Sequence, residues 1–474
     1  MRFLRNATSI LASDAVSRGS TFVLYVLVGR YLGAREFGQL SLALALFYAF
    51  QVLAGAGLKV YITRQVARDP AQTDQCLVSG SAVAIAFALV SIAATFAFVS
   101  LLGYPSDTRR VVLLLSLALL PFALCAVCEG VFQGRERMHH IVQATLPANV
   151  LKIAIAFALL ATGHGLEAVV TVAVVAYVAV LLIEWLLLIR HVTRPQFAFS
   201  LRRSVAIGRG SSTFLGVDAL VAVMASVNVL LLSKLWDERA VGTYSAAVQL
   251  MVPVALVYQN AVLAVFPLMS RSIETGLDDV RVVAQRVGEL LMALGWFVVV
   301  ALVVLAAPAV ALVYGPEFEA TADALRLMAW SLLLVGLTAT FGQILYARGQ
   351  EHLNLRLVAI NAVVTLLVGI PLVARWGVTG AAVALLATRV FDFALHYAAV
   401  SRVMPRLDMR QIVIRPAIAA TCAAPVLAAA ADRSAPAALV LGGVVYIAVL
   451  VLLTRRSAGG LRHLKARYLD MSTE

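Results

Sequence analysis

Stretches of about 20 mostly apolar residues, the length that lets an α-helix cross a bilayer, recur along the whole chain between short polar links. Fourteen such stretches are present, with the bounds Ser9–Val28, Leu40–Gly57, Leu77–Leu102, Val111–Val131, Ile141–Ala161, Ala168–Ile189, Ser204–Leu235, Val241–Leu268, Val282–Val313, Ala324–Tyr346, Leu355–Ala374, Val378–Val400, Ile412–Ala430 and Ala437–Leu453. The pattern predicts an all-α polytopic membrane protein with fourteen transmembrane helices.

The composition agrees with a chain that lies mainly in the membrane. Hydrophobic residues make up 62% and charged residues 13%, whereas soluble domains carry about 25% charged residues. No link is long enough to hold a separate catalytic domain. The net charge of +13 comes from basic residues in links beside the spans, which favours a role in topology over nucleic-acid binding.

The basic residues also predict an orientation. Of the 38 Lys and Arg residues, 25 lie on the side of the N-terminus, 9 on the other side and four within spans. Because positive residues are retained inside, both termini are expected in the cytoplasm. The first span is expected to stay as a signal anchor.

A weak internal repeat divides the chain. A shift of 204 residues superposes these pairs: Asp14 on Asp218, Arg30 on Lys234, Gly38 on Gly242, Ser41 on Ser245, Ala43 on Ala247 and Leu46 on Leu250. Six spans separate the copies, so both halves have the same orientation. Parallel repeats are a transporter architecture with the site expected between the halves. We therefore predict lobes at 1–195 and 196–403, followed by two further helices in 404–474.

One segment resembles a known family. The stretch GRYLGAREFGQLSLA (Gly29–Ala43) follows a first span with a polar face, contains a Gly33-x4-Gly38 link and has a weaker echo at Leu235–Ala247. Together with the span count and the repeat, it resembles the opening of the Wzx-type oligosaccharide flippases, the polysaccharide transport family. Their superfamily, MOP, also holds the lipid II flippases and the MATE drug exporters.

The resemblance implies a two-lobed bundle, with MATE or lipid II flippase-like lobes of six helices around a cavity that opens alternately to each side. The implied partner is an undecaprenyl-pyrophosphate-linked oligosaccharide, moved from the cytoplasmic to the periplasmic leaflet of the bacterial inner membrane for polysaccharide biosynthesis. Membrane lipids, a coupled proton or sodium ion, and a neighbouring polymerase or glycosyltransferase are the other implied partners. No cofactor and no nucleic acid is expected.

Two other functions remain open. A MATE-type cation-coupled drug exporter would use an acidic residue of the first lobe, such as Asp14, to bind its ion, but the two extra spans count against it. A membrane polysaccharide polymerase or glycosyltransferase would need a large periplasmic loop or an acidic pair on a loop, and neither is seen. We therefore expect that the protein is not an enzyme.

The first span carries Asp14, Arg18, Thr21 and Tyr25 on one helical stripe. Ionised groups in a span are expelled from lipid and face protein or water. The i,i+4 spacing allows an ion pair between Asp14 and Arg18 that serves only packing. The other interpretation is a cavity lining in which Arg18 binds substrate or Asp14 couples an ion.

The twelfth span repeats the pattern with Arg389, Asp392 and His396. Arg389 lies near mid-depth, where a charge is costly, and is a candidate substrate-binding residue. Asp392 and His396 are candidate ion-coupling residues, since imidazole titrates near neutral pH. His396 also lies near the helix end, where a hydrated structural histidine is common.

Lys152 and Asp218 lie near mid-depth with no opposite charge three or four residues away. A salt bridge between helices would satisfy either of them. In the alternative, Lys152 binds substrate phosphate and Asp218 couples an ion.

Arg64, Arg209 and Arg271 lie at the cytoplasmic rim and either attract a pyrophosphate or only set the topology. Glu129 and Glu184 are interpreted as interfacial. No metal site is expected.

Overall fold

The computed structural model describes residues 2–193, 200–212, 215–405, 407–431 and 434–455, without the side chains of 2–8, 10–11, 215–218, 263–275, 277 and 455. These described residues form helices joined by short links, and no strand occurs among them. The predicted all-α class is confirmed.

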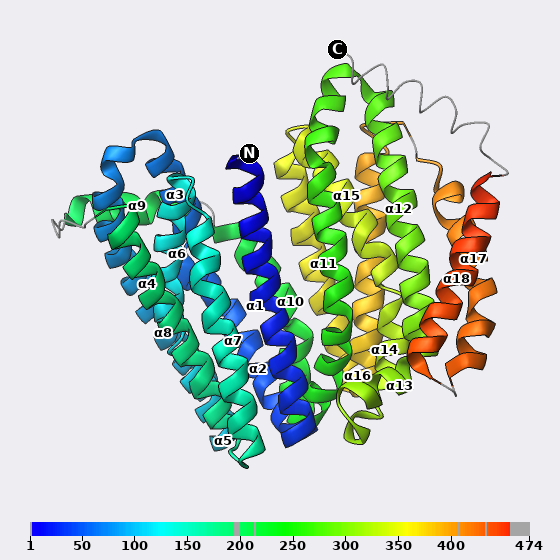
Figure 1. Cartoon of the computed structure of the whole chain (residues 1–474), viewed down its shortest axis with the longest axis horizontal. Helices are drawn as coiled ribbons and strands as arrows, with labels where there is room; N and C mark the ends of the chain where they lie inside the picture. The colour runs from blue at the N-terminus through cyan, green and yellow to red at the C-terminus, as the bar shows by residue number, and fades with distance from the viewer. Residues whose placement is uncertain (1, 194–199, 213–214, 406, 432–433, 456–474) are drawn as a thin grey trace. The chain divides into compact units, whose positions relative to one another are not determined.

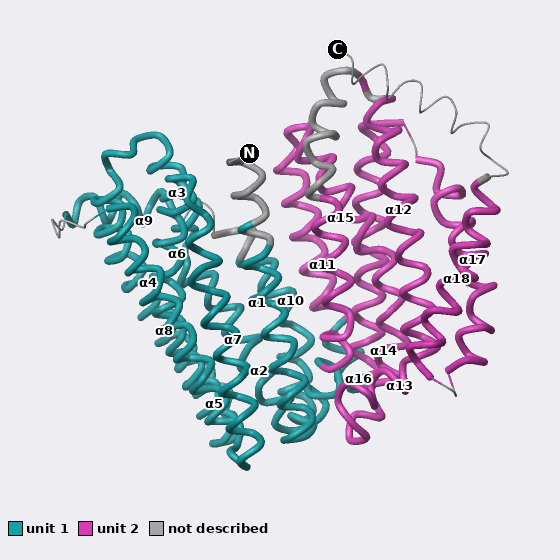
Figure 2. Tube along the Cα trace, in the orientation of Figure 1, with its two compact units in different colours: residues 1–245, 369–378 teal, residues 246–368, 379–474 magenta. Residues whose placement is uncertain are grey.

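The chain forms two compact units. Residues 1–245 and 369–378 make up unit 1, and residues 246–368 and 379–474 make up unit 2 (Figure 2). The predicted lobe boundaries near residues 195 and 403 stay predictions.

Unit 1 contains ten complete α-helices in its described part. They are α1 (Arg2–Leu32), α2 (Ala34–Gly55), α3 (Leu58–Arg68), α4 (Thr73–Leu101), α5 (Ser106–Ser116), α6 (Leu119–Gly134), α7 (His139–Ala161), α8 (Leu166–His191), α9 (Leu201–Ser212) and α10 (Leu215–Leu235). A short 3-10 turn, η1 (Pro70–Gln72), leads into α4.

The helix α2 forms the centre of unit 1. Almost every side chain from Ala34 to Phe47 is buried, and α2 packs against α1, α4, α5, α6 and α10 (Figure 1). The alternating small and large residues of LSLALALF explain this position, because they let several helices approach one axis closely. The segment that carries the family resemblance is therefore the packing core of the unit.

Two glycines superposed by the repeat lie in this core. A Cβ atom at Gly38 would lie 1.7 Å from the carbonyl oxygen of Glu238, and one at Gly242 would lie 2.0 Å from the carbonyl oxygen of Ala34. Only glycine allows the start of α2 and the start of α11 (Glu238–Thr275) to come this close. The repeat detected in the sequence thus corresponds to a reciprocal contact in the structure.

Unit 2 contains most of α11, followed by α12 (Leu277–Val304), α13 (Ala306–Val313), η2 (Pro316–Phe318), α14 (Thr321–Ala329), α15 (Leu332–Ala347), most of α16 (Glu351–Val400), α17 (Met409–Ala431) and α18 (Ala435–Arg455). The hairpin of α17 and α18 packs on α12. Its seam combines small residues such as Ala419 and Ala423 with Tyr446, whose hydroxyl donates to the carbonyl of Ala293 at 2.5 Å.

The described residues of the fourteen predicted spans lie mainly on helices. By length and apolarity, ten helices of the described chain are able to cross a membrane, or eleven if α14 and α15, bent by 42°, form one span. One of them, α16, is broken at Gly377 (φ 54°, ψ −126°) and covers two predicted spans. Of the other two predicted spans, Ser9–Val28 lies on α1, and Ser204–Leu235 covers most of α9 and the whole of α10, which is apolar over Ala219–Leu235. The protein is a multi-pass membrane protein.

Candidate functional site

A row of polar side chains joins α1 to α7 inside unit 1. Ser13 Oγ lies 2.9 Å from Thr145 Oγ1, and Ser20 Oγ donates to Asn149 Oδ1 at 2.6 Å. Lys152 Nζ donates to both Ser20 Oγ and Asn149 Oδ1, each at 2.8 Å. We call these five residues the α1–α7 seam.

Lys152 is held in the seam by neutral partners. No carboxylate among the described side chains lies within 4.0 Å of its ammonium group. An ammonium group has three N–H donors, and the two seam bonds use two of them. The salt bridge considered from the sequence is therefore absent between Lys152 and the described carboxylates.

Asp14 and Arg18 form the predicted ion pair on α1. Arg18 Nε donates to Asp14 Oδ1 at 3.0 Å and to Oδ2 at 2.9 Å. Their side chains are 49% and 48% exposed, so the pair does not serve packing. Tyr25, placed on the same stripe, is instead buried against Phe37 of α2 with ring centroids 4.9 Å apart.

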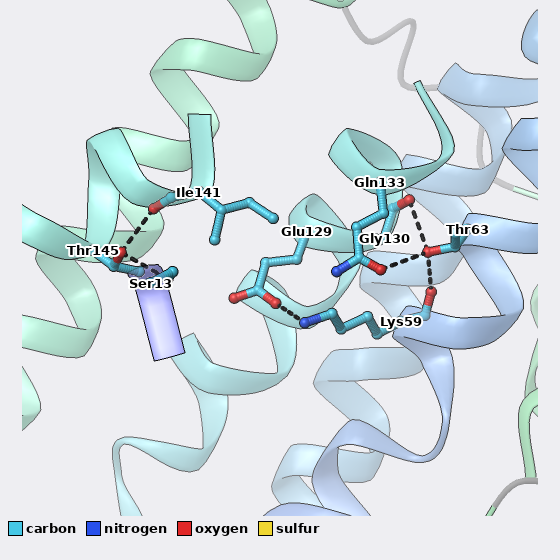
Figure 3. Close-up of polar contacts among 8 residues, drawn as sticks. All are labelled: Ser13, Lys59, Thr63, Glu129, Gly130, Gln133, Ile141 and Thr145. Carbon is cyan, nitrogen blue, oxygen red and sulfur yellow. Dashed lines mark hydrogen bonds and ion pairs between the residues drawn. The ribbon is translucent and has the colours of Figure 1, made fainter. Parts of the chain in front are cut away.

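A second polar group joins α3 to α6 (Figure 3). Lys59 Nζ donates to the carboxylate of Glu129. One turn along α3, Thr63 Oγ1 donates to the carbonyl oxygens of Lys59 at 2.7 Å and Gly130 at 3.2 Å. Glu129 is thus paired with a lysine of another helix, a partner that the interfacial interpretation did not include.

Glu184 of α8 is fully enclosed in protein, with 0% exposure. Neither of its carboxylate oxygens has a hydrogen-bond partner in the described part of the chain. Its polar neighbours are Cys125 and Glu129 of α6 and Lys59 of α3. Glu184 is therefore an enclosed residue of the helix bundle, and the interpretation that its side chain reaches the interface is wrong.

Unit 2 contains the predicted charged group of α16. Asp392 Oδ2 lies 4.0 Å from Arg389 Nη1, and Asp392 Oδ1 lies 3.1 Å from His396 Nδ1. His396 Nε2 lies 3.2 Å from Asn354 Oδ1 in the first half of α16. The Asn354 amide nitrogen donates to Tyr346 at 2.9 Å, so its oxygen faces the imidazole.

His396 is 4% exposed and has an oxygen acceptor beside each ring nitrogen. Both nitrogens are donors only in the imidazolium form, so this environment suits a protonated ring. The hydrated helix-end histidine considered from the sequence is not what the structure shows. Asn354, which completes the group, was missed because nothing in the sequence indicates that it pairs with a residue 42 positions away.

The rim arginines are placed only in part. Arg64 on α3 and Arg209 on α9 are exposed, and their helices are in contact. The side chains of Asp218 and Arg271 lie outside the described residues. Sequence reasoning also missed Ser13, Ser20, Thr145 and Asn149, since small polar residues are common in membrane helices.

A family model described as polysaccharide biosynthesis protein matches residues 3–273, more than half of the chain. The chain belongs to this family. A second model, described as lipid II flippase MurJ, matches residues 239–450. Both families are of the transporter type, and the similarity to flippases indicated by Gly29–Ala43 is confirmed.

Individual proteins agree with this membership. Stage V sporulation protein B of Bacillus subtilis (strain 168) is 24% identical over 443 residues, which cover 85% of this chain and 84% of that protein. The fold is similar to that of the lipid II flippase MurJ in an inward closed conformation, with a TM-score of 0.78 and 13% identity over 96% of this chain and 99% of that one. The fold is also similar to that of an inward-facing MATE multidrug transporter, with a TM-score of 0.66 and 13% identity. That match covers 84% of this chain and 98% of the transporter.

Proposed function

We propose that the protein is a flippase that moves undecaprenyl-pyrophosphate-linked oligosaccharide from the cytoplasmic to the periplasmic leaflet. It acts in the bacterial inner membrane by alternating access, without covalent chemistry, and serves the synthesis of surface polysaccharide. The family match over residues 3–273 and the similarity to the lipid II flippase MurJ support this class of cargo. A polymerase or a glycosyltransferase is its expected neighbour.

The observation that carries the proposal is the environment of Lys152. Its ammonium group keeps one N–H donor beyond the bonds to Ser20 and Asn149, and no described carboxylate neutralises it. Lys152 is half-buried, and a charge withdrawn from water without a counter-ion is costly. A phosphate oxygen would both accept the third bond and neutralise the charge. A pyrophosphate therefore complements this site better than an organic cation does.

The remaining predicted residues take supporting roles. The exposed Asp14–Arg18 pair would be expelled from lipid tails, which supports a hydrated surface along α1 in contact with the sugar. The further substrate-binding candidates are Arg389, Arg64, Arg209 and Arg271, and the ion-coupling candidates are Asp14, Asp218, Asp392 and His396. Asp392 and His396 are the best supported of the coupling residues, because both are buried and hydrogen-bonded to each other.

The test replaces Lys152 in a deletion strain and measures undecaprenyl-linked oligosaccharide that accumulates inside the cell. Lys152→Met removes the charge but keeps the chain length, and the rate of transfer is expected to fall about tenfold or more, as for loss of a charge-assisted hydrogen bond. Lys152→Arg keeps the charge and is expected to retain part of the activity. Lys234→Met, at the exposed end of α10, is the matched control. Full activity of Lys152→Met would refute the phosphate contact.

Cation-coupled drug export is the second candidate function. The similarity to the MATE transporter supports a shared fold, and the exposed Asp14 offers a carboxylate for an ion or a cationic drug. Efflux of a fluorescent cation from cells with the wild type and with Asp14→Asn decides between the two. Export that depends on Asp14, without accumulation of lipid-linked oligosaccharide in the deletion strain, would favour the exporter.

A further inference from the structure

A cavity of about 630 Å³ lies in unit 1 between the start of α7 and the end of α8. Its polar lining contains Arg137, His139, His140 and His191. This volume lies in the range of about 300–1,000 Å³ that is usual for small-molecule sites. None of its lining residues belongs to the α1–α7 seam or to the charged group of α16, so it is a separate feature.

The three imidazoles lie in contact along one wall, with His191 stacked on His140 and His139 tilted against it. The ring centroids of His139 and His140 lie 4.0 Å apart, and those of His140 and His191 lie 4.9 Å apart with an interplanar angle of 29°. Phe132 lies 5.4 Å from His140 on the side of α6. The stack holds the rings in fixed positions from two helices at once.

Hydrogen bonds determine which ring nitrogens remain for a ligand. His140 Nδ1 lies 2.8 Å from the side-chain oxygen of Gln143, and His191 Nδ1 lies 3.2 Å from the carbonyl oxygen of Leu187. Both acceptors require a proton on Nδ1. The Nε2 atoms of these two rings therefore remain. Burial lowers the pKa of His140, so its Nε2 is an acceptor in the neutral ring and donates only when a bound anion favours protonation.

Arg137 supplies a permanent positive charge. One Nη1 hydrogen donates to the backbone carbonyl of His191, which fixes the guanidinium at the end of α8. Guanidinium has five N–H donors, and within the described chain no carboxylate lies within 4.0 Å of it. The cavity thus contains a fixed cation with unused donors and no described counter-ion.

The remaining wall is apolar and belongs to a membrane span. Leu187 and Ile183 line the cavity one and two turns before His191 on α8, respectively. The cavity therefore changes from cationic to apolar in the direction of the membrane interior. A free anion would satisfy only the first part of this lining, whereas an amphiphile with a phosphate headgroup satisfies both.

We propose that this cavity binds the phosphate headgroup of an anionic membrane phospholipid, with the start of an acyl chain against Ile183 and Leu187. Arg137 donates hydrogen bonds to the phosphate, and the rings of His140 and His191 form the wall beside it, where their Nε2 atoms donate in the protonated form. Basic pockets between transmembrane helices are known to favour such headgroups. The proposal does not depend on the transported substrate.

The test measures lipid binding to the full chain purified in a neutral detergent. Native mass spectrometry compares phosphatidylglycerol with zwitterionic phosphatidylcholine of the same acyl chains. We expect preferential retention of phosphatidylglycerol, and Arg137→Gln is expected to weaken it about tenfold or more, as for loss of a charge-assisted hydrogen bond. Arg190→Gln removes an exposed arginine next to His191 that does not line the cavity, and is expected to leave binding unchanged.

A second variant keeps the test decisive if Arg137→Gln does not fold. His191→Phe preserves the ring against His140 but removes the nitrogen donor, and is expected to weaken phosphatidylglycerol binding several-fold. A phosphate group in the cavity could come from a lipid headgroup or from free inorganic phosphate. Adding inorganic phosphate at millimolar concentration distinguishes the two. Three outcomes would each overturn the proposal: displacement of the lipid by phosphate alone, equal retention of both lipids, or a loss of binding in Arg190→Gln equal to that in Arg137→Gln.

Discussion

Charged side chains in the spans of this protein find their partners in three different ways. Asp14 and Arg18 pair along one helix, Lys59 and Glu129 pair between helices, and Lys152 binds neutral oxygens. The i,i+4 spacing made the first arrangement predictable. The other two depend on which helices are neighbours, and a pattern within one helix contains no information about that.

Glu184 gives a stability prediction at the residue scale. A buried carboxylate without a hydrogen bond is costly when it is ionised, and an amide of the same shape fills the same space without a charge. We expect Glu184→Gln to change the free energy of unfolding by less than about 1 kcal/mol and Glu184→Lys, which forces a charge into the same space, to cost about 3–5 kcal/mol.

The free energy of unfolding is measured in detergent, with the fluorescence of the five tryptophans as the signal. Glu167→Lys, on the exposed first turn of the same helix, is the matched control, with an expected cost below about 1 kcal/mol. A large loss of stability in Glu184→Gln would mean that the carboxylate is ionised and held by a partner.

The Asp392–His396 pair is expected to be strongly coupled. A double-mutant cycle with Asp392→Asn and His396→Gln should give an interaction energy of about 1–3 kcal/mol, because both groups are buried and in direct contact. The exposed pair Asp323 and Arg326, 2.7 Å apart on α14, is the control cycle, with an expected value of about 0.2–1 kcal/mol. Equal energies in the two cycles would show that burial does not strengthen the histidine pair.

At the scale of helices, hydropathy located the ten helices long and apolar enough to cross a membrane, but not the breaks inside the predicted spans. Short interruptions separate α5 from α6, α12 from α13, and α14 from α15, all within continuous apolar sequence. Pro121 and Pro308 lie in the first turns of α6 and α13 and are a local sign of the first two breaks. Between α14 and α15 the sequence offers no such sign. The break in α16 was predictable, because Arg375 and Gly377 interrupt the apolar pattern.

The reciprocal glycine contact gives a prediction at the same scale. Gly38→Ala or Gly242→Ala places a methyl group within about 2 Å of a backbone carbonyl, and backbone yields less readily than a side chain. We expect each variant to lose at least about 1–3 kcal/mol of stability, the usual cost of overpacking. Gly19→Ala, where an added Cβ has nothing within 4 Å, is the control and is expected to be neutral or slightly stabilising. Thermal unfolding in detergent compares the three.

For the whole molecule, composition and span count were sufficient to predict a polytopic membrane protein, and a few glycine and polar matches were sufficient to detect the repeat. The residues that complete each polar group were not predictable, because Ser20, Asn149 and Asn354 act through helix pairing over long sequence separations. Long-range pairing of this kind depends on how whole helices pack. Only the ionised residues can be recognised as candidate site residues from the sequence alone, because they are rare and costly in membranes.

The direction of transport rests on the orientation of the whole chain, and this has a direct test. The excess of basic residues predicts that Glu136 lies in the cytoplasm and that Ser106, at the start of α5, lies in the periplasm. Both positions are exposed, and Cys422 is the one exposed native cysteine, while Cys76, Cys125 and Cys128 are buried. In a Cys422→Ala background, a membrane-impermeant maleimide is therefore expected to label Ser106→Cys in intact spheroplasts and Glu136→Cys only after permeabilisation. The reverse result would place the Arg137 cavity, which adjoins Glu136 in sequence, at the periplasmic surface. The proposed substrate would then be taken from the periplasmic leaflet, because the two halves of a parallel repeat have the same orientation in the membrane.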